Sequence, residues 1–85
     1  MRILVVEDEK KVASFIKRGL EEEEFHVDVA YDGEEGVHMA ENTTYDLILM
    51  DVMLPKKDGL SAIKELRHKN IPTPILCLFS ITKTK

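Results

Sequence analysis

Leu47-Ile48-Leu49-Met50-Asp51 is the stretch of this sequence that decides its fold. Four apolar residues lead directly into a carboxylate, and a loop containing proline and glycine follows over residues 52–59. A short apolar run of this kind is typical of a strand buried on both faces of a parallel sheet. Such a strand delivers its final acid to the sheet edge at which α/β proteins bind their ligands. The stretch therefore predicts a central strand and a site at its end.

A second stretch has the same shape. The residues Ile3 to Val6 are apolar and run directly into Glu7, Asp8 and Glu9. If this strand lies beside the first and parallel to it, the carboxylates of Glu7, Asp8 and Asp51 meet at one edge of the sheet.

The rest of the chain alternates between strand-like and helix-like patterns. Helical spacing of apolar residues predicts helices over residues 10–24, 34–42 and 60–69. The third helix is expected to begin after an N-cap at Asp58 and to bury Leu60, Ile63 and Leu66. Further strands are expected over residues 2–6, 25–31, 45–50 and 75–79. The order β-α-β-α-β-α-β predicts an α/β fold with a parallel sheet, right-handed crossovers and helices on both faces.

Composition restricts the classes of protein. A chain of 85 residues with 44% hydrophobic residues makes one small domain with a modest core. A net charge of -4 argues against direct DNA binding, which needs a basic patch. No apolar run approaches the ~20 residues of a membrane span. The single cysteine, Cys77, favours a reducing cytoplasm.

Three carboxylates at one edge indicate a particular chemistry. Like charges a few ångströms apart repel one another, and a hard divalent cation relieves that repulsion. Oxygen ligands without histidine or cysteine favour Mg2+, or Mn2+, over zinc. Backbone N–H groups in the loop after Asp51 could hold an anion, so Asp51 is a candidate phosphoryl acceptor. The alternative is that Glu7 and Asp8 only cap the first helix and that Asp51 only ends a strand.

The motifs at residues 3–9 (ILVVEDE), 45–55 (YDLILMDVMLP) and 58–59 (DG) resemble the receiver domain of bacterial two-component response regulators. The winged-helix transcription-factor subfamily is the most similar, and the resemblance runs from Met1 to about Leu78. It implies a flavodoxin-like sheet with strand order 2-1-3-4. It also implies that Asp51 is the phosphoacceptor in a switch rather than an enzyme, with a sensor histidine kinase as donor. Mg2+ would be bound by the side chains of Asp8 and Asp51, by the backbone carbonyl of Met53, and by Glu7 through water.

The sequence also departs from that family. We expect residues 1–79 to form a receiver domain truncated after its fourth strand, and residues 80–85 to form a polar tail. Phe79 stands where the family has the threonine or serine that contacts the phosphoryl group. Ser80 is one residue late, and one step along a strand turns a side chain to the other face. The family's lysine after the fifth strand also has no counterpart, so we expect impaired phosphotransfer.

Two alternative functions remain open. An uncovered fourth strand would be a template for pairing, so the chain is expected to form a homodimer or a larger homo-oligomer. One alternative is therefore a non-signalling receiver fragment that self-associates through its exposed sheet edge. The other is an acyl-phosphate phosphohydrolase, which usually has a second aspartate two residues after its nucleophile. That position is Met53 here, which argues against this class.

Overall fold

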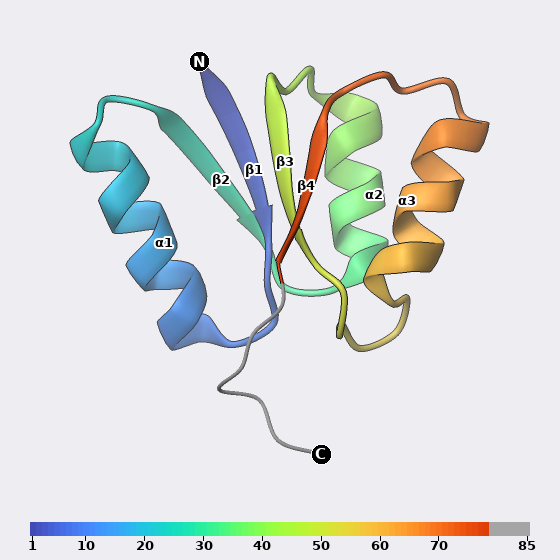
Figure 1. Cartoon of the computed structure of the whole chain (residues 1–85), viewed down its shortest axis with the longest axis horizontal. Coiled ribbons are helices and arrows are strands. Elements are labelled where there is room, and N and C mark those ends of the chain that lie inside the picture. The colour runs from blue at the N-terminus through green and yellow to red at the C-terminus, as the bar shows by residue number, and fades with distance from the viewer. Residues whose placement is uncertain (79–85) are drawn as a thin grey trace.

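The computed structural model describes residues 1–78, which form a parallel sheet with helices packed on both of its faces (Figure 1). Strands and helices alternate along the chain: β1 (Arg2–Val6), α1 (Lys10–Glu22), β2 (His26–Ala30), α2 (Gly33–Asn42), β3 (Leu47–Asp51), α3 (Gly59–His68) and β4 (Ile75–Leu78). The strand order is β2-β1-β3-β4, with every pair parallel. The predicted α/β class and strand order are confirmed. Within these residues, no helix is long and apolar enough to cross a bilayer.

The register of the central strands fixes where their acids emerge. In the β1–β3 pair, Ile3 lies beside Leu47 and Val6 lies beside Met50. The next residues are Glu7 on one strand and Asp51 on the other, and both follow an unbroken apolar run that is buried against helices. The pairing of β3 with β4 continues one step further and ends with Asp51 beside Leu78.

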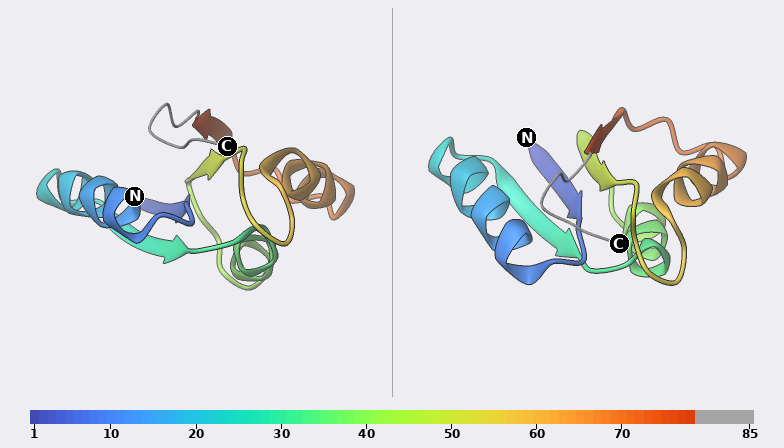
Figure 2. Two further views of the ribbon diagram at one scale, coloured as in Figure 1. Left: turned by 90° about the horizontal axis from the view of Figure 1, so that it is seen from below. Right: turned by 60° about the horizontal axis from the view of Figure 1, so that its bottom comes forward.

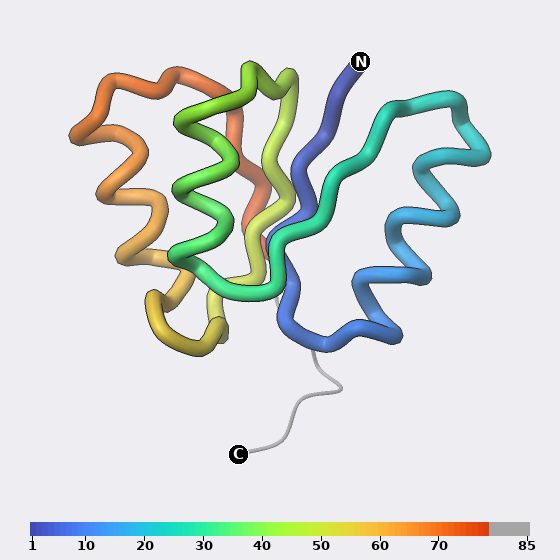
Figure 3. Tube along the Cα trace, turned by 180° about the vertical axis from the view of Figure 1, so that it is seen from behind, coloured from blue at the N-terminus to red at the C-terminus, as the bar shows by residue number. Residues whose placement is uncertain are grey.

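The two faces of the sheet are covered unequally (Figure 2). Figure 3 shows α2 and α3 side by side on one face, where they enclose the larger core. That core includes Leu4, Val6, Ile48 and Met50 from the strands, and Val37, Ala40, Ala62 and Leu66 from the helices. On the other face, α1 alone packs against a smaller core made by Ile3, Val5, Val27 and Leu49.

A single helix leaves part of the second face exposed. Phe15 of α1 has an exposed fraction of 76%, and Leu76 of β4 has one of 57%. Leu76 is in register with Leu49, which belongs to the core beneath α1, so Leu76 lies on the same face. Within residues 1–78, Leu76 on β4 is therefore uncovered, as expected for a fourth strand at an open edge, and Phe15 on α1 is exposed as well.

Two local predictions were wrong. Leu60 was expected to be buried, but 60% of its surface is exposed. The buried stripe of α3 runs through Gly59, Ala62 and Leu66, and Leu60 lies two residues from Ala62, where side chains do not share a face. The second helix was expected to start at residue 34, but Asp32 is an N-cap whose carboxylate accepts the Glu35 N–H at 2.8 Å, so α2 starts at residue 33.

A polar network joins three strands at the ends opposite to the acids. Asp28 Oδ2 on β2 accepts the Tyr45 hydroxyl at 2.7 Å and forms an ion pair with Arg2 Nη2 at 3.0 Å. The Arg2 guanidinium also lies 5.7 Å from the centre of the Tyr45 ring. The backbone N–H of Arg2 donates to Asp46 Oδ2 at 2.7 Å. The network ties β1, β2 and the residues that precede β3 to one another.

The network shifts the pKa values of two of its members. For Asp28, burial has the largest single effect and raises the pKa, but the hydrogen bonds from Tyr45 and Arg2, with the charges of Arg2 and His26, together lower it below 3.8. For Tyr45, burial and then the hydrogen bond to Asp28 raise the pKa to about 12. Both shifts favour the pair in which Tyr45 is neutral and Asp28 is charged.

Replacing Tyr45 with phenylalanine tests this network. Tyr45→Phe should lower the free energy of unfolding at pH 7 by about 1.5 kcal/mol, the lower end of the range for one hydrogen bond to a charged acceptor. Because the folded-state pKa of Asp28 is below 3.8, its contribution is present above that value and is lost as pH falls through the folded pKa. The difference between wild type and variant should therefore shrink at acidic pH in urea unfolding followed by circular dichroism.

The matched control is Tyr31→Phe. Tyr31 is 42% exposed, and its ring lies 5.7 Å from Lys10 Nζ, a contact that phenylalanine keeps. An equal loss of stability in both variants, or a Tyr45→Phe deficit that does not change with pH, would contradict the role given to the network.

Candidate functional site

Three carboxylates meet where β1 and β3 end. Glu7, Asp8 and Asp51 each place a carboxylate oxygen within 4.8 Å of the other two. The exposed fraction is 1% for Glu7 and 0% for Asp51, while Asp8 is partly accessible. The strands converge on this edge at the lower side of the sheet in Figure 1. The structure thus brings together the three side chains that the sequence places at one edge.

Backbone N–H groups fix the orientation of two of these carboxylates. Glu7 Oε2 accepts the N–H of Glu9 at 2.8 Å, and Asp51 Oδ1 accepts the N–H of Met53 at 3.0 Å. In each case the donor is two residues further along the chain, so the carboxylate folds back onto the loop that follows its strand. The Glu7 N–H in turn donates to the Ala30 carbonyl at 3.0 Å, which continues the sheet to the edge of the site.

The donor set suits a hard cation. All candidate ligand atoms of the cluster are carboxylate oxygens, and no histidine or cysteine of residues 1–78 joins them. The three histidines, His26, His38 and His68, are exposed, as expected for surface residues. Oxygen-only sites of this kind favour Mg2+ or Mn2+ over zinc.

The loop after Asp51 is closed tightly at its base. The Gly59 N–H donates to the Val52 carbonyl at 3.1 Å, and a Cβ on Gly59 would lie 2.5 Å from the Asp51 carbonyl oxygen. Glycine is therefore required there by close approach. The predicted N-cap is confirmed, because Asp58 Oδ1 accepts the Ser61 N–H at 2.9 Å and α3 starts from it. Met53 lies in this loop, two residues after Asp51, the acid that ends β3.

Some of the predicted site features lie outside the residues that the structure describes. They are Phe79, the candidate hydroxyl of Ser80, and the tail expected over residues 80–85. β4 ends at Leu78, in register with Asp51, and the Val52 N–H donates to the Leu78 carbonyl at 3.3 Å.

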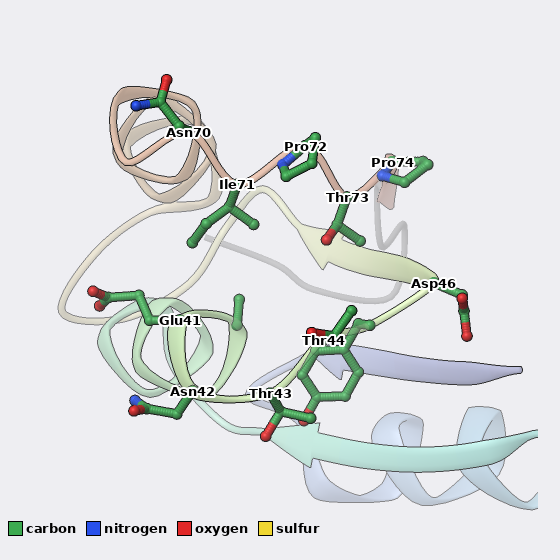
Figure 4. A pocket seen from close by; sticks show the side chains of 12 residues that line it. Glu41, Asn42, Thr43, Thr44, Asp46, Asn70, Ile71, Pro72, Thr73 and Pro74 are labelled. Carbon is green, nitrogen blue, oxygen red and sulfur yellow. The ribbon is translucent and has the colours of Figure 1, made fainter.

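A pocket lies away from the acidic cluster. A cavity of about 490 Å3 lies at the opposite ends of the strands, between the end of α2 and the connection from α3 to β4 (Figure 4). Two of its acids are already engaged, since Glu41 pairs with Lys69 at 3.1 Å and Asp46 accepts the Arg2 N–H. This pocket and the acidic cluster therefore lie at opposite ends of the strands.

The sequence matches a known family over most of its length. The response regulator receiver domain model matches residues 3–84. The transcriptional regulatory protein DltR of Streptococcus agalactiae is 44% identical over 84 residues, which cover 99% of this chain and 38% of DltR. The chain thus spans well under half the length of this relative.

Solved structures give the same result. The receiver domain of the Francisella response regulator 1452 has a TM-score of 0.90 and 41% identity, and the match covers 98% of this chain and 69% of that one. The response regulator TrrA of Thermotoga maritima, in complex with Mg2+-BeF, has a TM-score of 0.87 and 36% identity. That match covers 92% of this chain and 68% of the TrrA chain.

The crowding of carboxylates makes a prediction for stability. Asp51→Asn should raise the free energy of unfolding of the metal-free protein by about 1 kcal/mol or more, because it removes one of three neighbouring carboxylates, two of which are buried. Asparagine still offers an oxygen to the Met53 N–H, so the loop contact is kept. Urea unfolding in the presence of a chelator measures the change.

Glu22→Gln is the control, because Glu22 is an exposed acid at the end of α1 and should change stability little. A metal-free Asp51→Asn protein that is less stable than wild type would show that Asp51 is held by favourable contacts rather than by crowding.

Proposed function

The chain belongs to the response regulator receiver domain family, and from this premise we propose that Asp51 accepts a phosphoryl group in a two-component phosphorelay. The observation that carries the proposal is the convergence of Glu7, Asp8 and Asp51 within 4.8 Å at the carboxyl ends of two parallel strands. The donor would be the phosphohistidine of a sensor histidine kinase. One carboxylate oxygen of Asp51 would bond to phosphorus as the phosphorus–nitrogen bond breaks, leaving an acyl phosphate. This makes the domain a switch rather than an enzyme with turnover.

The proposed metal ligands come from both loops at this edge. Asp8 and Asp51 would bind Mg2+ directly, the Met53 backbone carbonyl would complete the protein ligands, and Glu7 would act through water. The all-oxygen donor set supports this assignment, and so does the similarity to TrrA in complex with Mg2+-BeF. Mg2+ would offset the charge on the incoming phosphoryl oxygens. Mn2+ satisfies the same donor set.

Two features support a weakened phosphotransfer in this chain. Phe79 replaces the expected hydroxyl residue, and a lost donor to developing charge costs ~100-fold or more in rate. The lysines nearest to Asp51 in sequence are engaged elsewhere, since Lys56 Nζ lies 3.6 Å from Asp32 and Lys57 Nζ lies 2.7 Å from Glu65. The proposal places the exchange in the cytoplasm, without direct contact with DNA or membrane.

Acetyl phosphate and beryllofluoride test the proposal. With Mg2+, beryllofluoride should shift the amide resonances of residues around Asp51, and acetyl phosphate should add one phosphoryl group detectable by intact mass spectrometry. Both effects should be absent from Asp51→Asn. Phe79→Thr should increase phosphorylation by about tenfold or more if the missing hydroxyl limits the reaction.

Asp46→Asn serves as the control, because Asp46 is an exposed aspartate at the far end of the sheet. Unchanged amide resonances in wild type with Mg2+ and beryllofluoride would refute the switch. Phosphorylation of Phe79→Thr at the wild-type level would refute the role given to Phe79.

A second function, self-association, is favoured by the exposed apolar face. We propose that the 85-residue chain pairs with a second copy of itself through the edge strand β4. β4 is an edge strand of the sheet that residues 1–78 form, so its outer backbone groups lie along the side of that sheet, and the side chain of Leu76 on this strand is exposed. Pairing around a two-fold axis would satisfy these groups in both copies at once.

Light scattering coupled to size exclusion tests this pairing. Wild type should elute at twice the monomer mass or more at micromolar concentration, and Leu76→Lys should shift it to monomer because it puts a charge into the paired face. Leu60→Lys is a matched control, since Leu60 is about as exposed on α3 as Leu76 is on β4. A wild-type monomer, or equal dissociation by both lysine variants, would exclude pairing through this face.

A further inference from the structure

Gly33 is in direct contact with the loop that follows Asp51. A Cβ built on Gly33 would lie 1.9 Å from the backbone oxygen of Lys57, 2.7 Å from its carbonyl carbon and 2.9 Å from its Cβ. The obstacle is backbone, which cannot rotate away as a long side chain can. The φ angle of Gly33 is not positive, so glycine is required here by the close approach of the loop and not by an unusual backbone conformation.

The neighbouring residues strengthen the same contact. Asp32, the N-cap of α2, holds the Glu35 N–H with Oδ1 and lies 3.6 Å from Lys56 Nζ through Oδ2. Lys56 has a φ of 65°, in the left-handed region that a lysine rarely adopts. Two consecutive loop residues therefore contact two consecutive residues at the start of α2, and one of them has a strained backbone.

The loop transmits this contact to the acidic site. At its base, the Gly59 N–H bonds to the Val52 carbonyl, and near its tip the Lys57 N–H bonds to the Pro55 carbonyl at 2.7 Å. Between these points lies Met53, whose N–H holds Asp51 Oδ1 at 3.0 Å. A displacement of the tip would move the segment that orients Asp51 and supplies the Met53 carbonyl.

We infer that Gly33 is a positioning residue for the metal site, acting through its backbone contact with Lys57. The effect of Gly33 on Mg2+ binding rests on the proposed function. The contact between Gly33 and Lys57 does not, because it is present in the protein without metal. In Gly33→Ala, the Lys57 oxygen must retreat from 1.9 Å to an ordinary contact of at least 3.4 Å from the new Cβ. A misplacement on the scale of 1 Å can cost about 100-fold in rate at a catalytic site, even when the mutation is far from the reacting atoms.

Two glycine variants separate positioning from stability. Gly36 lies on the same helix, and a Cβ there would meet the Val6 side chain at 3.0 Å, within the core and away from the loop. Gly19 is exposed on α1, with nothing within 4 Å of an added Cβ. Gly36→Ala therefore introduces strain in α2 without moving the loop, and Gly19→Ala adds a helix-forming methyl group without any contact.

The experiment measures two quantities on the whole chain. The first is the dissociation constant for Mg2+ alone, by titration of amide resonances. The second is the hydrogen exchange of the Lys57 and Gly59 amides in the metal-free protein. Gly33→Ala should raise the Mg2+ dissociation constant by about tenfold or more and speed exchange at both amides. Gly36→Ala and Gly19→Ala should leave the dissociation constant within about twofold of wild type, as expected for substitutions without contact to the site.

The outcomes distinguish failure of the inference from failure of the proposed function. If wild type binds no Mg2+, the proposed metal site fails, and the exchange rates still decide whether Gly33 holds the loop. If Gly33→Ala binds Mg2+ as wild type does and its loop amides exchange at the wild-type rate, the inference is overturned. An equal loss of affinity in Gly36→Ala would also overturn it, because strain in α2 alone would then explain the effect.

Asp32→Ser provides a second variant in case Gly33→Ala does not fold. Serine keeps an N-cap acceptor for the Glu35 N–H but removes the carboxylate that faces Lys56. Faster exchange at Lys57 and Gly59 in this variant supports the positioning role, and unchanged exchange at both amides rejects it.

Discussion

Confinement of like charge at one edge of the sheet is the constraint on which the rest of this structure depends. The parallel register of β1 and β3 forces Glu7 and Asp51 to emerge side by side, with Asp8 following directly. Burial of the two strands on both faces restricts any separation of these acids, because a shift in register by one residue would move every apolar side chain into the opposite core, where it does not fit. The cost of charge repulsion is thus offset by apolar packing elsewhere in the same strands.

Much of this arrangement can be predicted from the sequence, because it depends on local pattern. The runs that end at Val6 and Asp51 are apolar on both faces, and alternation of strand with helix implies parallel pairing. The position of the acids follows from these two facts alone. Asp58 was equally predictable, since a capping residue acts on its own neighbours.

The features that were not predicted depend on residues distant in sequence. Tyr45 and Asp28 are 17 positions apart, and nothing local to either indicates that they meet. The contact of Gly33 with Lys57 is of the same kind, although an aspartate followed three residues later by a glutamate was a signal for a helix start at this point. The predicted burial of Leu60 was wrong for a different reason. Leu60 is apolar, but its angle around α3 places it away from the buried stripe of that helix.

The sheet has opposite electrostatic character at its two ends. At one end, Arg2, Asp28 and Tyr45 form a network of opposite charges and hydrogen bonds, whereas at the other end three carboxylates lie within 4.8 Å of one another. The same strands therefore run from a locally stable region to a locally costly one, and opening fluctuations should begin at the acidic end. A cation or an acyl phosphate that settles there would even out this gradient along the strands. The two states of such a domain would then differ in the order in which their amide hydrogen bonds open, while the backbone topology stays the same.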